Sequence, residues 1–129
     1  MANAYQVYRE TMPMLPAVVA RASRMKMFRR LDFGRLAALN VLDTRQYRTD
    51  QPCGDGNKAP CPDALNPEAT VLGRTQRDWL LRGLEQSPAA WNVLAQQIMM
   101  ARVDRMAGPD LTVSMDQWPG YEFERRLLL

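Results

Sequence analysis

A chain of 129 residues suffices for one domain with its own core, and 47% hydrophobic with 24% charged residues is an ordinary globular composition. Histidine is absent, so the chain itself cannot supply the side chain that most catalytic zinc sites and most neutral-pH general acid–base sites use. The sequence contains no apolar run of about 18 residues, so no membrane span is predicted. The amino terminus also lacks the pattern of a signal peptide.

The net charge of +3 is mild, but a group of basic residues lies between positions 21 and 35. The group consists of Arg21, Arg24, Lys26, Arg29, Arg30 and Arg35. Such a cluster can bind phosphate-bearing partners, and one hypothesis is therefore a binder of nucleic acid or of a phosphate polymer. No series of stacking aromatic residues accompanies the cluster, so a solvated basic face is favoured and no nucleic-acid partner is expected.

The amino-terminal segment is predicted to be helical over residues 4–12, because Pro13 and Pro16 follow and end the helix. Residues 17–22 show no clear periodicity. We expect a loop or a single helical turn there.

Two extended runs, residues 27–33 and 35–42, flank Gly34 and predict a β-hairpin. The first run mixes polar and apolar residues, as a half-exposed strand does. The second is apolar up to Leu42 and includes β-branched Val41, so it is expected to be buried on both faces.

The end of that second strand carries Asp43 and Arg45. In open α/β sheets, ligands bind beyond the carboxyl ends of strands, so both residues are candidates for a functional site. The alternative is a structural ion pair or a loop anchor, which is the commoner role of such a pair.

Residues 49–70 are predicted to form a long loop without periodicity, and loops of this length in a compact domain are often functional. The loop contains Cys53 and Cys61. A disulfide between them would stabilise the fold by about 2–3 kcal/mol. A bridged pair in an exported protein and two free thiols remain equally compatible with the sequence.

Apolar residues at helical spacing predict an amphipathic helix over Gly73–Glu85, in which Gly83 indicates close packing on a sheet. Residues 91–100 are mostly apolar and predict a further buried strand. Strand, helix and strand in this order are typical of a βαβ crossover. Gln96 and Gln97 interrupt the last run, and one of them is expected to face a polar cavity or the strand edge.

The carboxyl-terminal part is predicted to begin with a loop over residues 102–113 and a compact turn over residues 114–121. A helix over residues 121–129 follows. It ends in three consecutive leucines, which is unusual for a natural terminus, so the chain is expected to be an internal piece of one larger domain, incomplete at both ends.

Three segments together resemble the PhoD-like alkaline phosphatases, a family of metallophosphatases. The first is Leu-Asp-Thr-Arg-Gln-Tyr-Arg at residues 42–48, followed by Asp-Gln-Pro-Cys at residues 50–53. The second combines the Leu-Gly and Trp-Leu of the predicted helix with Trp-Asn-Val at residues 91–93 and Gln-Gln at residues 96–97. The third is the turn from Met115 to Tyr121. A segment at residues 4–13 also fits, so the resemblance covers essentially the whole chain in order.

The resemblance implies an α/β fold, the central fragment of a two-sheet metallophosphoesterase-like sandwich with long loops. It also implies hydrolysis of phosphate mono- and diesters with iron and calcium, in an exported, periplasmic or extracellular protein. The family's metal-ligand motifs do not occur in this chain, so the chain alone is expected to be inactive. Ser114 and Pro119 stand where the family commonly has Asn and a second Asp in its tryptophan-containing turn.

Two main hypotheses follow. The chain is either part of a metal-dependent phosphatase or phosphodiesterase, or a non-enzymatic truncated product or small binding domain that keeps the middle of the fold. In the first case the candidates for shaping or bracing the substrate site are Asp43, Arg45, Gln97, Asp116, Trp118 and Tyr121. Core packing is the alternative role for Trp118 and Tyr121, and a satisfied buried amide is the alternative for Gln97.

Overall fold

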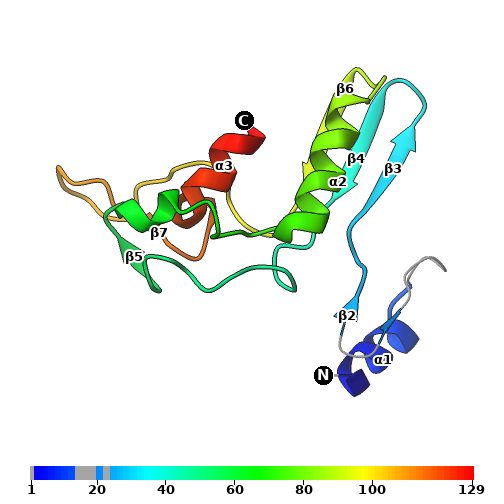
Figure 1. The fold of residues 1–129 in the computed structure, drawn as a ribbon, viewed down its shortest axis with the longest axis horizontal. Helices are drawn as coiled ribbons and strands as arrows, with labels where there is room; N and C mark the ends of the chain where they lie inside the picture. Colours follow the sequence, from blue (N-terminus) through cyan, green and yellow to red (C-terminus); the bar gives the residue numbers. More distant parts are fainter. Residues whose placement is uncertain (1, 14–19, 22–23) are drawn as a thin grey trace.

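The computed structural model of the chain describes residues 2–13, 20–21 and 24–129 (Figure 1). Its helices are α1 (Ala2–Thr11), α2 (Gly73–Glu85) and α3 (Glu122–Leu128), and two 3-10 helices span Pro62–Leu65 and Trp118–Tyr121. The strands are β1 (Ala20–Arg21), β2 (Arg24–Met25), β3 (Arg29–Phe33), β4 (Ala37–Val41), β5 (Asn57–Lys58), β6 (Trp91–Ala95) and β7 (Val113–Ser114). The α/β class predicted from the sequence is confirmed.

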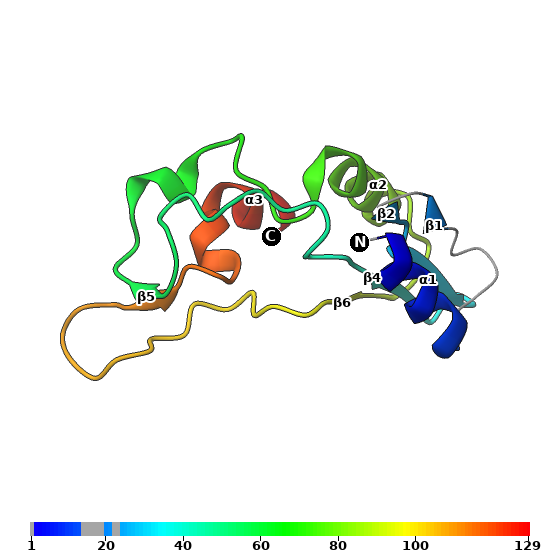
Figure 2. The same ribbon diagram turned by 90° about the horizontal axis from the view of Figure 1, so that it is seen from below.

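The largest sheet has the strand order β3-β4-β6. Strands β3 and β4 form the predicted antiparallel hairpin, with Leu31 opposite Leu39, around a turn in which Gly34 has a φ of 57°. Strand β6 joins β4 in parallel, with Leu39 opposite Val93. The connection between them passes through α2, which lies along one face of the sheet (Figure 2), so the predicted crossover is confirmed.

Helix α2 has the predicted bounds, Gly73–Glu85. Its close approach to the sheet occurs at Gly83, where an added Cβ would lie 2.5 Å from Arg30 Nη2 of β3. Arg30 Nε in turn donates a hydrogen bond to Asn40 Oδ1 of β4 (2.9 Å). The missing side chain of Gly83 therefore lets the helix lie over a guanidinium held by the sheet.

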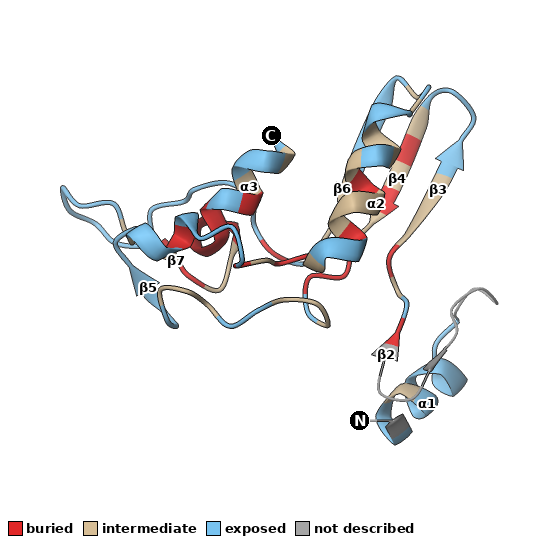
Figure 3. Cartoon of the chain, in the orientation of Figure 1, coloured by how far each residue is buried: buried red, intermediate tan, exposed pale blue. Residues whose placement is uncertain are grey.

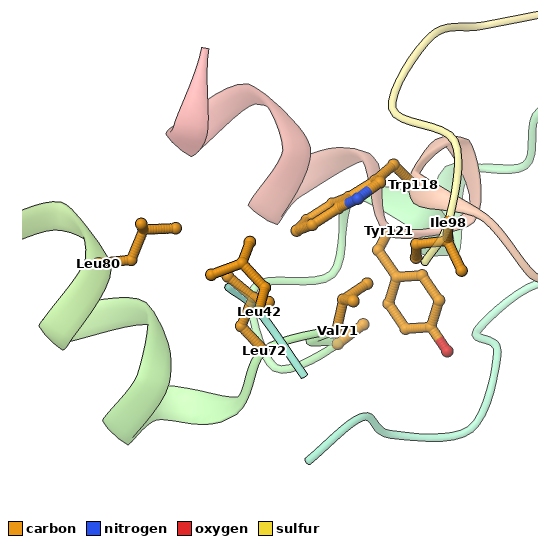
Figure 4. Packing of buried hydrophobic residues seen from close by; sticks show 8 residues of the cluster. Leu42, Val71, Leu72, Leu80, Ile98, Trp118 and Tyr121 are labelled. Carbon is orange, nitrogen blue, oxygen red and sulfur yellow. The ribbon is translucent and has the colours of Figure 1, made fainter. Parts of the chain in front are cut away.

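The long loop after β4 and the residues after β6 pack beyond the other end of α2, around the short β5–β7 ladder, the two 3-10 helices and α3, whereas α1, β1 and β2 lie apart from them, before β3 (Figure 1). The core joins the two ends. It contains the buried residues Leu42, Ala69, Val71, Leu72, Leu80, Ile98, Trp118 and Tyr121 (Figure 4). Cys53 and Cys61 form a disulfide across the long loop, which resolves the alternative that the sequence left open.

Two predictions about burial are wrong (Figure 3). Strand β4 alternates between buried residues and half-buried ones, so it is not buried on both faces. The strand predicted over residues 91–100 ends at Ala95, and its Trp91 and Val93 are 68% and 45% exposed. Strand β6 is an edge strand of its sheet, and an apolar sequence does not reveal whether another element covers it.

The predicted terminal elements are found with shifted bounds. The first helix spans Ala2–Thr11, and the last spans Glu122–Leu128 after a 3-10 turn. The prediction of a loop or turn over residues 17–22 is wrong for Ala20–Arg21, which pair with β2 because a neighbouring strand supplies their hydrogen-bond partners. Residues 17–19 and 22 lie outside the described residues. In the described ranges no helix has the length and hydropathy needed to cross a bilayer.

Candidate functional site

Polar side chains gather where β4 and β6 end side by side. Val41 lies opposite Ala95, and one further bond, from Leu42 N to Ala95 O (2.8 Å), extends the ladder. Asp43 follows the first strand, and Gln97 follows the second. The carboxyl ends of parallel strands meet at one edge of a sheet, which is where ligands bind in open α/β folds.

Asp43 is a loop anchor rather than the partner of Arg45 in an ion pair. Its Oδ1 accepts the backbone N–H groups of Arg45 and Gln46 (3.0 Å each), and its Oδ2 accepts a hydrogen bond from Gln46 Nε2. The Gln46 side chain also bonds to the backbone N–H and C=O of Met25 (3.1 and 2.9 Å). The carboxylate therefore fixes the turn from which Arg45 extends.

Two glutamines hold the same segment from different elements. Gln76 of α2, fully buried, accepts from Asp43 N and donates to Asp43 O (2.8 Å each). Gln97 accepts from the backbone N–H and the hydroxyl of Thr44 (3.2 and 2.6 Å) and donates to Leu42 O (3.2 Å). Gln97 is thus a satisfied amide, although it is exposed rather than buried.

Sequence reasoning missed the role of Gln76. Gln76 falls at helical spacing with the apolar residues of α2, and this spacing alone does not indicate a partner for it. The available signal was an amide among leucines on a buried face, because such a group needs hydrogen-bond partners.

A cavity of about 300 Å³ opens at this edge of the sheet. Its lining, whose surface is mostly apolar, comes from α1, from the start of β3 and from the segments that follow β4 and β6. The lining residues are Tyr5, Met27, Arg29, Val41, Leu42, Asp43, Arg45, Gln46 and Gln97. The structure therefore brings together three of the candidates, Asp43, Arg45 and Gln97.

Arg29 is a lining residue that the sequence did not single out. It belonged to a run of basic residues for which a solvated face was predicted. The hairpin register places Arg29 opposite Val41, at the strand end that borders the cavity. That register depends on long-range pairing, so only the structure separates Arg29 from its basic neighbours.

Asp116 lies beside the cavity and is linked to it through Arg45. Arg48 donates to its backbone oxygen (3.2 Å) and to its carboxylate, Gln51 Nε2 donates to Oδ1 (3.0 Å), and Arg45 Nη2 lies 3.5 Å from Oδ2. The hydrogen bond from Arg48 lowers the pKa of Asp116, and the positive charges of Arg48 and Arg45 lower it further, against the opposing effect of burial. Asp116 is therefore ionised at neutral pH, and it positions the two arginines rather than acting as a general acid.

Trp118 and Tyr121 belong to the core and are not among the cavity-lining residues of the described chain. Trp118 Nε1 donates to Gln96 Oε1, and Tyr121 Oη donates to Thr49 O (2.6 Å). Burial raises the pKa of Tyr121, so its hydroxyl stays protonated at neutral pH. Both side chains support the loops next to the site by packing.

The side chains present do not fit a metal centre. Throughout the described ranges, no group of three or more His, Cys, Asp or Glu side chains is placed to hold an ion. Both cysteines form the disulfide, the Asp43 carboxylate accepts three N–H donors, and Asp116 is paired with arginines. Metal ligation in this part of the fold would require breaking those contacts.

A mixed sheet covered by a helix, with a mostly apolar cavity at the ends of adjacent parallel strands, is an α/β arrangement in which ligands commonly bind at the strand ends. A family model described as PhoD-like phosphatase matches residues 1–129, and the chain belongs to that family, which confirms the resemblance seen in its motifs.

A sequence comparison and a structure comparison illustrate the similarity. The chain is 44% identical over 128 residues to alkaline phosphatase D of Bacillus subtilis (strain 168), a match that covers 99% of this chain and 22% of that protein. A solved structure of PhoD superimposes with a TM-score of 0.90 at 44% identity, over 98% of this chain and 24% of that one. The chain spans about a quarter or less of the length of these relatives.

Proposed function

We propose that these 129 residues form the central portion of a hydrolase domain that cleaves phosphate mono- and diesters. The observation that carries the proposal is the cavity at the ends of β4 and β6, lined by Arg45, in a chain of the PhoD-like phosphatase family. A guanidinium group presents a planar fork of N–H donors that matches the oxygens of a phosphoryl group. Phosphate esters are therefore the substrates that this edge of the sheet suits.

In this proposal the metal ions, iron and calcium, are held by residues from other parts of the hydrolase. Bound metal ions lower the pKa of a water molecule and neutralise charge on the phosphoryl oxygens. The residues of this chain act around the metal centre rather than as metal ligands. Arg45 contacts the substrate, Asp43 and Gln97 fix the backbone that carries it, and Asp116 orients its guanidinium. Trp118 and Tyr121 keep the supporting loops in place.

We also propose that the protein acts outside the cytoplasm, in the periplasm or extracellular space. The disulfide between Cys53 and Cys61 supports this location, because disulfides persist in oxidising compartments and are rare in the cytosol.

A chimera tests the proposed function. In it, this chain replaces the matching segment of alkaline phosphatase D from Bacillus subtilis, which is 44% identical to it. We expect the chimera, supplied with iron and calcium, to hydrolyse p-nitrophenyl phosphate, and the isolated chain to release no p-nitrophenol under the same conditions. A chimera that keeps the circular dichroism and melting temperature of the parent but has no activity would refute the proposal. Turnover by the isolated chain would refute the assignment of the metal ligands to other segments.

A further inference from the structure

The loop that the disulfide closes, residues 53–61, is attached to the residue that precedes Asp116. The loop contains β5, which pairs with β7 at only two positions and has no other strand partner in the described ranges. Met115 N adds one hydrogen bond, to Gly56 O (2.9 Å). A two-stranded ladder this short is marginally stable by itself in water, so it depends on a restraint that limits the conformations of the loop. The disulfide supplies that restraint.

The same loop reaches the Asp116 carboxylate through the side chain of Gln51. Gln51 Nε2 donates hydrogen bonds to Asp55 Oδ1 within the loop (2.7 Å) and to Asp116 Oδ1 (3.0 Å). Gln51 O accepts a hydrogen bond from Gly54 N (2.9 Å), so the position of Gln51 follows that of the loop. The loop therefore holds Asp116 at two points, the side chain through Gln51 and the backbone through β7.

Asp116 in turn lies between two arginines that differ in exposure. The side chain of Arg48 is 10% exposed, and its Cζ lies 5.7 Å from the ring centroid of Tyr121, so packing helps to fix it. The side chain of Arg45 is 60% exposed, and among the described residues its guanidinium pairs only with Asp116, at 3.5 Å. The orientation of Arg45 therefore depends on where the Asp116 carboxylate lies.

We propose that the Cys53–Cys61 bridge is a redox-sensitive latch that holds Asp116 against Arg45, closed when the bridge is formed and open when it is reduced. Opening requires a dithiol: two electrons and two protons pass to the bridge, the S–S bond breaks, two thiols form, and the dithiol closes to its own disulfide. Both cysteines are partly exposed, which gives a reductant access to the bridge. An effect on catalysis rests on the proposed function, in which Arg45 contacts the substrate, whereas the placement of Asp116 rests on contacts within this chain alone.

Nuclear magnetic resonance of the ¹⁵N- and ¹³C-labelled chain, with and without dithiothreitol, tests the placement of Asp116. Chemical shifts report the folded structure rather than its stability, so they separate a local opening from a general loss of stability. On reduction, the Met115 amide proton should lose its hydrogen-bonded shift and the Asp116 carboxyl carbon signal should move. The Leu42 amide, bonded to Ala95 O (2.8 Å), should keep its shift. Unchanged Met115 and Asp116 signals would overturn the latch, and so would the loss of all dispersed signals, because the bridge would then hold the whole fold.

A double-mutant cycle in the chimera tests the link to Arg45 without a reductant that disturbs the metal ions. The Cys53→Ser/Cys61→Ser chimera should approach the loss caused by Arg45→Ala, about tenfold in kcat/KM for p-nitrophenyl phosphate. Adding Arg45→Ala to it should cause no further loss, because both changes remove the same contact. The melting temperature shows that each chimera is folded in the assay.

The outcomes separate the latch from the proposed function. Where Arg45→Ala lowers kcat/KM, full activity of the Cys53→Ser/Cys61→Ser chimera, or multiplied losses in the combined variant, would refute the latch alone. Unchanged kcat/KM in Arg45→Ala, together with resonance shifts that move as expected, would refute the proposed role of Arg45 and support the latch.

Discussion

Replacing Glu124 by alanine removes the contact that joins α3 to the start of α2. The Glu124 side chain is fully buried and accepts hydrogen bonds from Thr70 Oγ1 (2.6 Å), Val71 N (2.6 Å) and Leu72 N (3.3 Å), and Arg77 Nη1 lies 3.6 Å from its carboxylate. The substitution leaves two buried backbone donors without an acceptor and an arginine without its partner. We expect the free energy of unfolding to fall by about 3–5 kcal/mol.

Equilibrium unfolding in urea, followed by the fluorescence of the buried Trp118, measures this loss. Glu124→Gln keeps one carbonyl acceptor and should cost less than the alanine variant. Glu85→Ala is the control, because Glu85 is exposed at the end of α2, and its effect should stay within about 0.5 kcal/mol. A Glu124→Ala variant as stable as this control would show that the carboxylate does not hold the two helices together.

Further predictions concern packing, redox state and pH. In Gly120→Ala, the new Cβ would lie 2.2 Å from the backbone oxygen of Met115, so we expect the free energy of unfolding in urea to fall by about 1–3 kcal/mol. An unchanged urea midpoint would contradict this close approach of the backbone. Reduction of the Cys53–Cys61 disulfide should lower stability by about 2–3 kcal/mol, measured in urea with and without dithiothreitol, and equal midpoints would rule out a constraint by the bridge. The pKa of Asp116 is lower in the folded state than in the unfolded state, where it is about 3.9. Ionised Asp116 therefore stabilises the fold at pH values above the unfolded-state pKa, and this stabilisation is lost as the pH falls through the folded-state pKa. The decline in melting temperature below about pH 4 should therefore be shallower in Asp116→Asn, and identical acid profiles would refute this role.

Features set by local sequence could be predicted. The bounds of α2 follow from apolar spacing, and the hairpin follows from two extended runs around Gly34. The parallel pairing of β4 and β6 follows from the crossover order, because a helix between two strands packs back on their sheet. At the site, the strand-end rule singled out Asp43 and Arg45, and the structure shows both, together with Gln97, in the lining of one cavity.

Features that depend on contacts far apart in the sequence could not be predicted. The hydrogen-bond donors to Glu124 lie more than fifty positions earlier, and Gln76 binds a backbone segment 33 positions away. Arg29 differs from Arg30 only in the face of β3 that carries it, and a shift of one residue in register would exchange their roles. The exposure of Trp91 depends on what covers an edge strand, which its own sequence does not encode.

The central claim, that this segment supplies the phosphate-binding edge of a larger hydrolase, is tested most directly by the kcat/KM of the chimera carrying Arg45→Ala. Loss of a charge-assisted contact to the phosphoryl group predicts a decrease of about tenfold or more for p-nitrophenyl phosphate. The chimera with Arg35→Ala should keep the kcat/KM of the unmodified chimera, because Arg35 lies in the exposed turn of the hairpin. An Arg45→Ala chimera that is as active as the Arg35→Ala chimera would contradict the account.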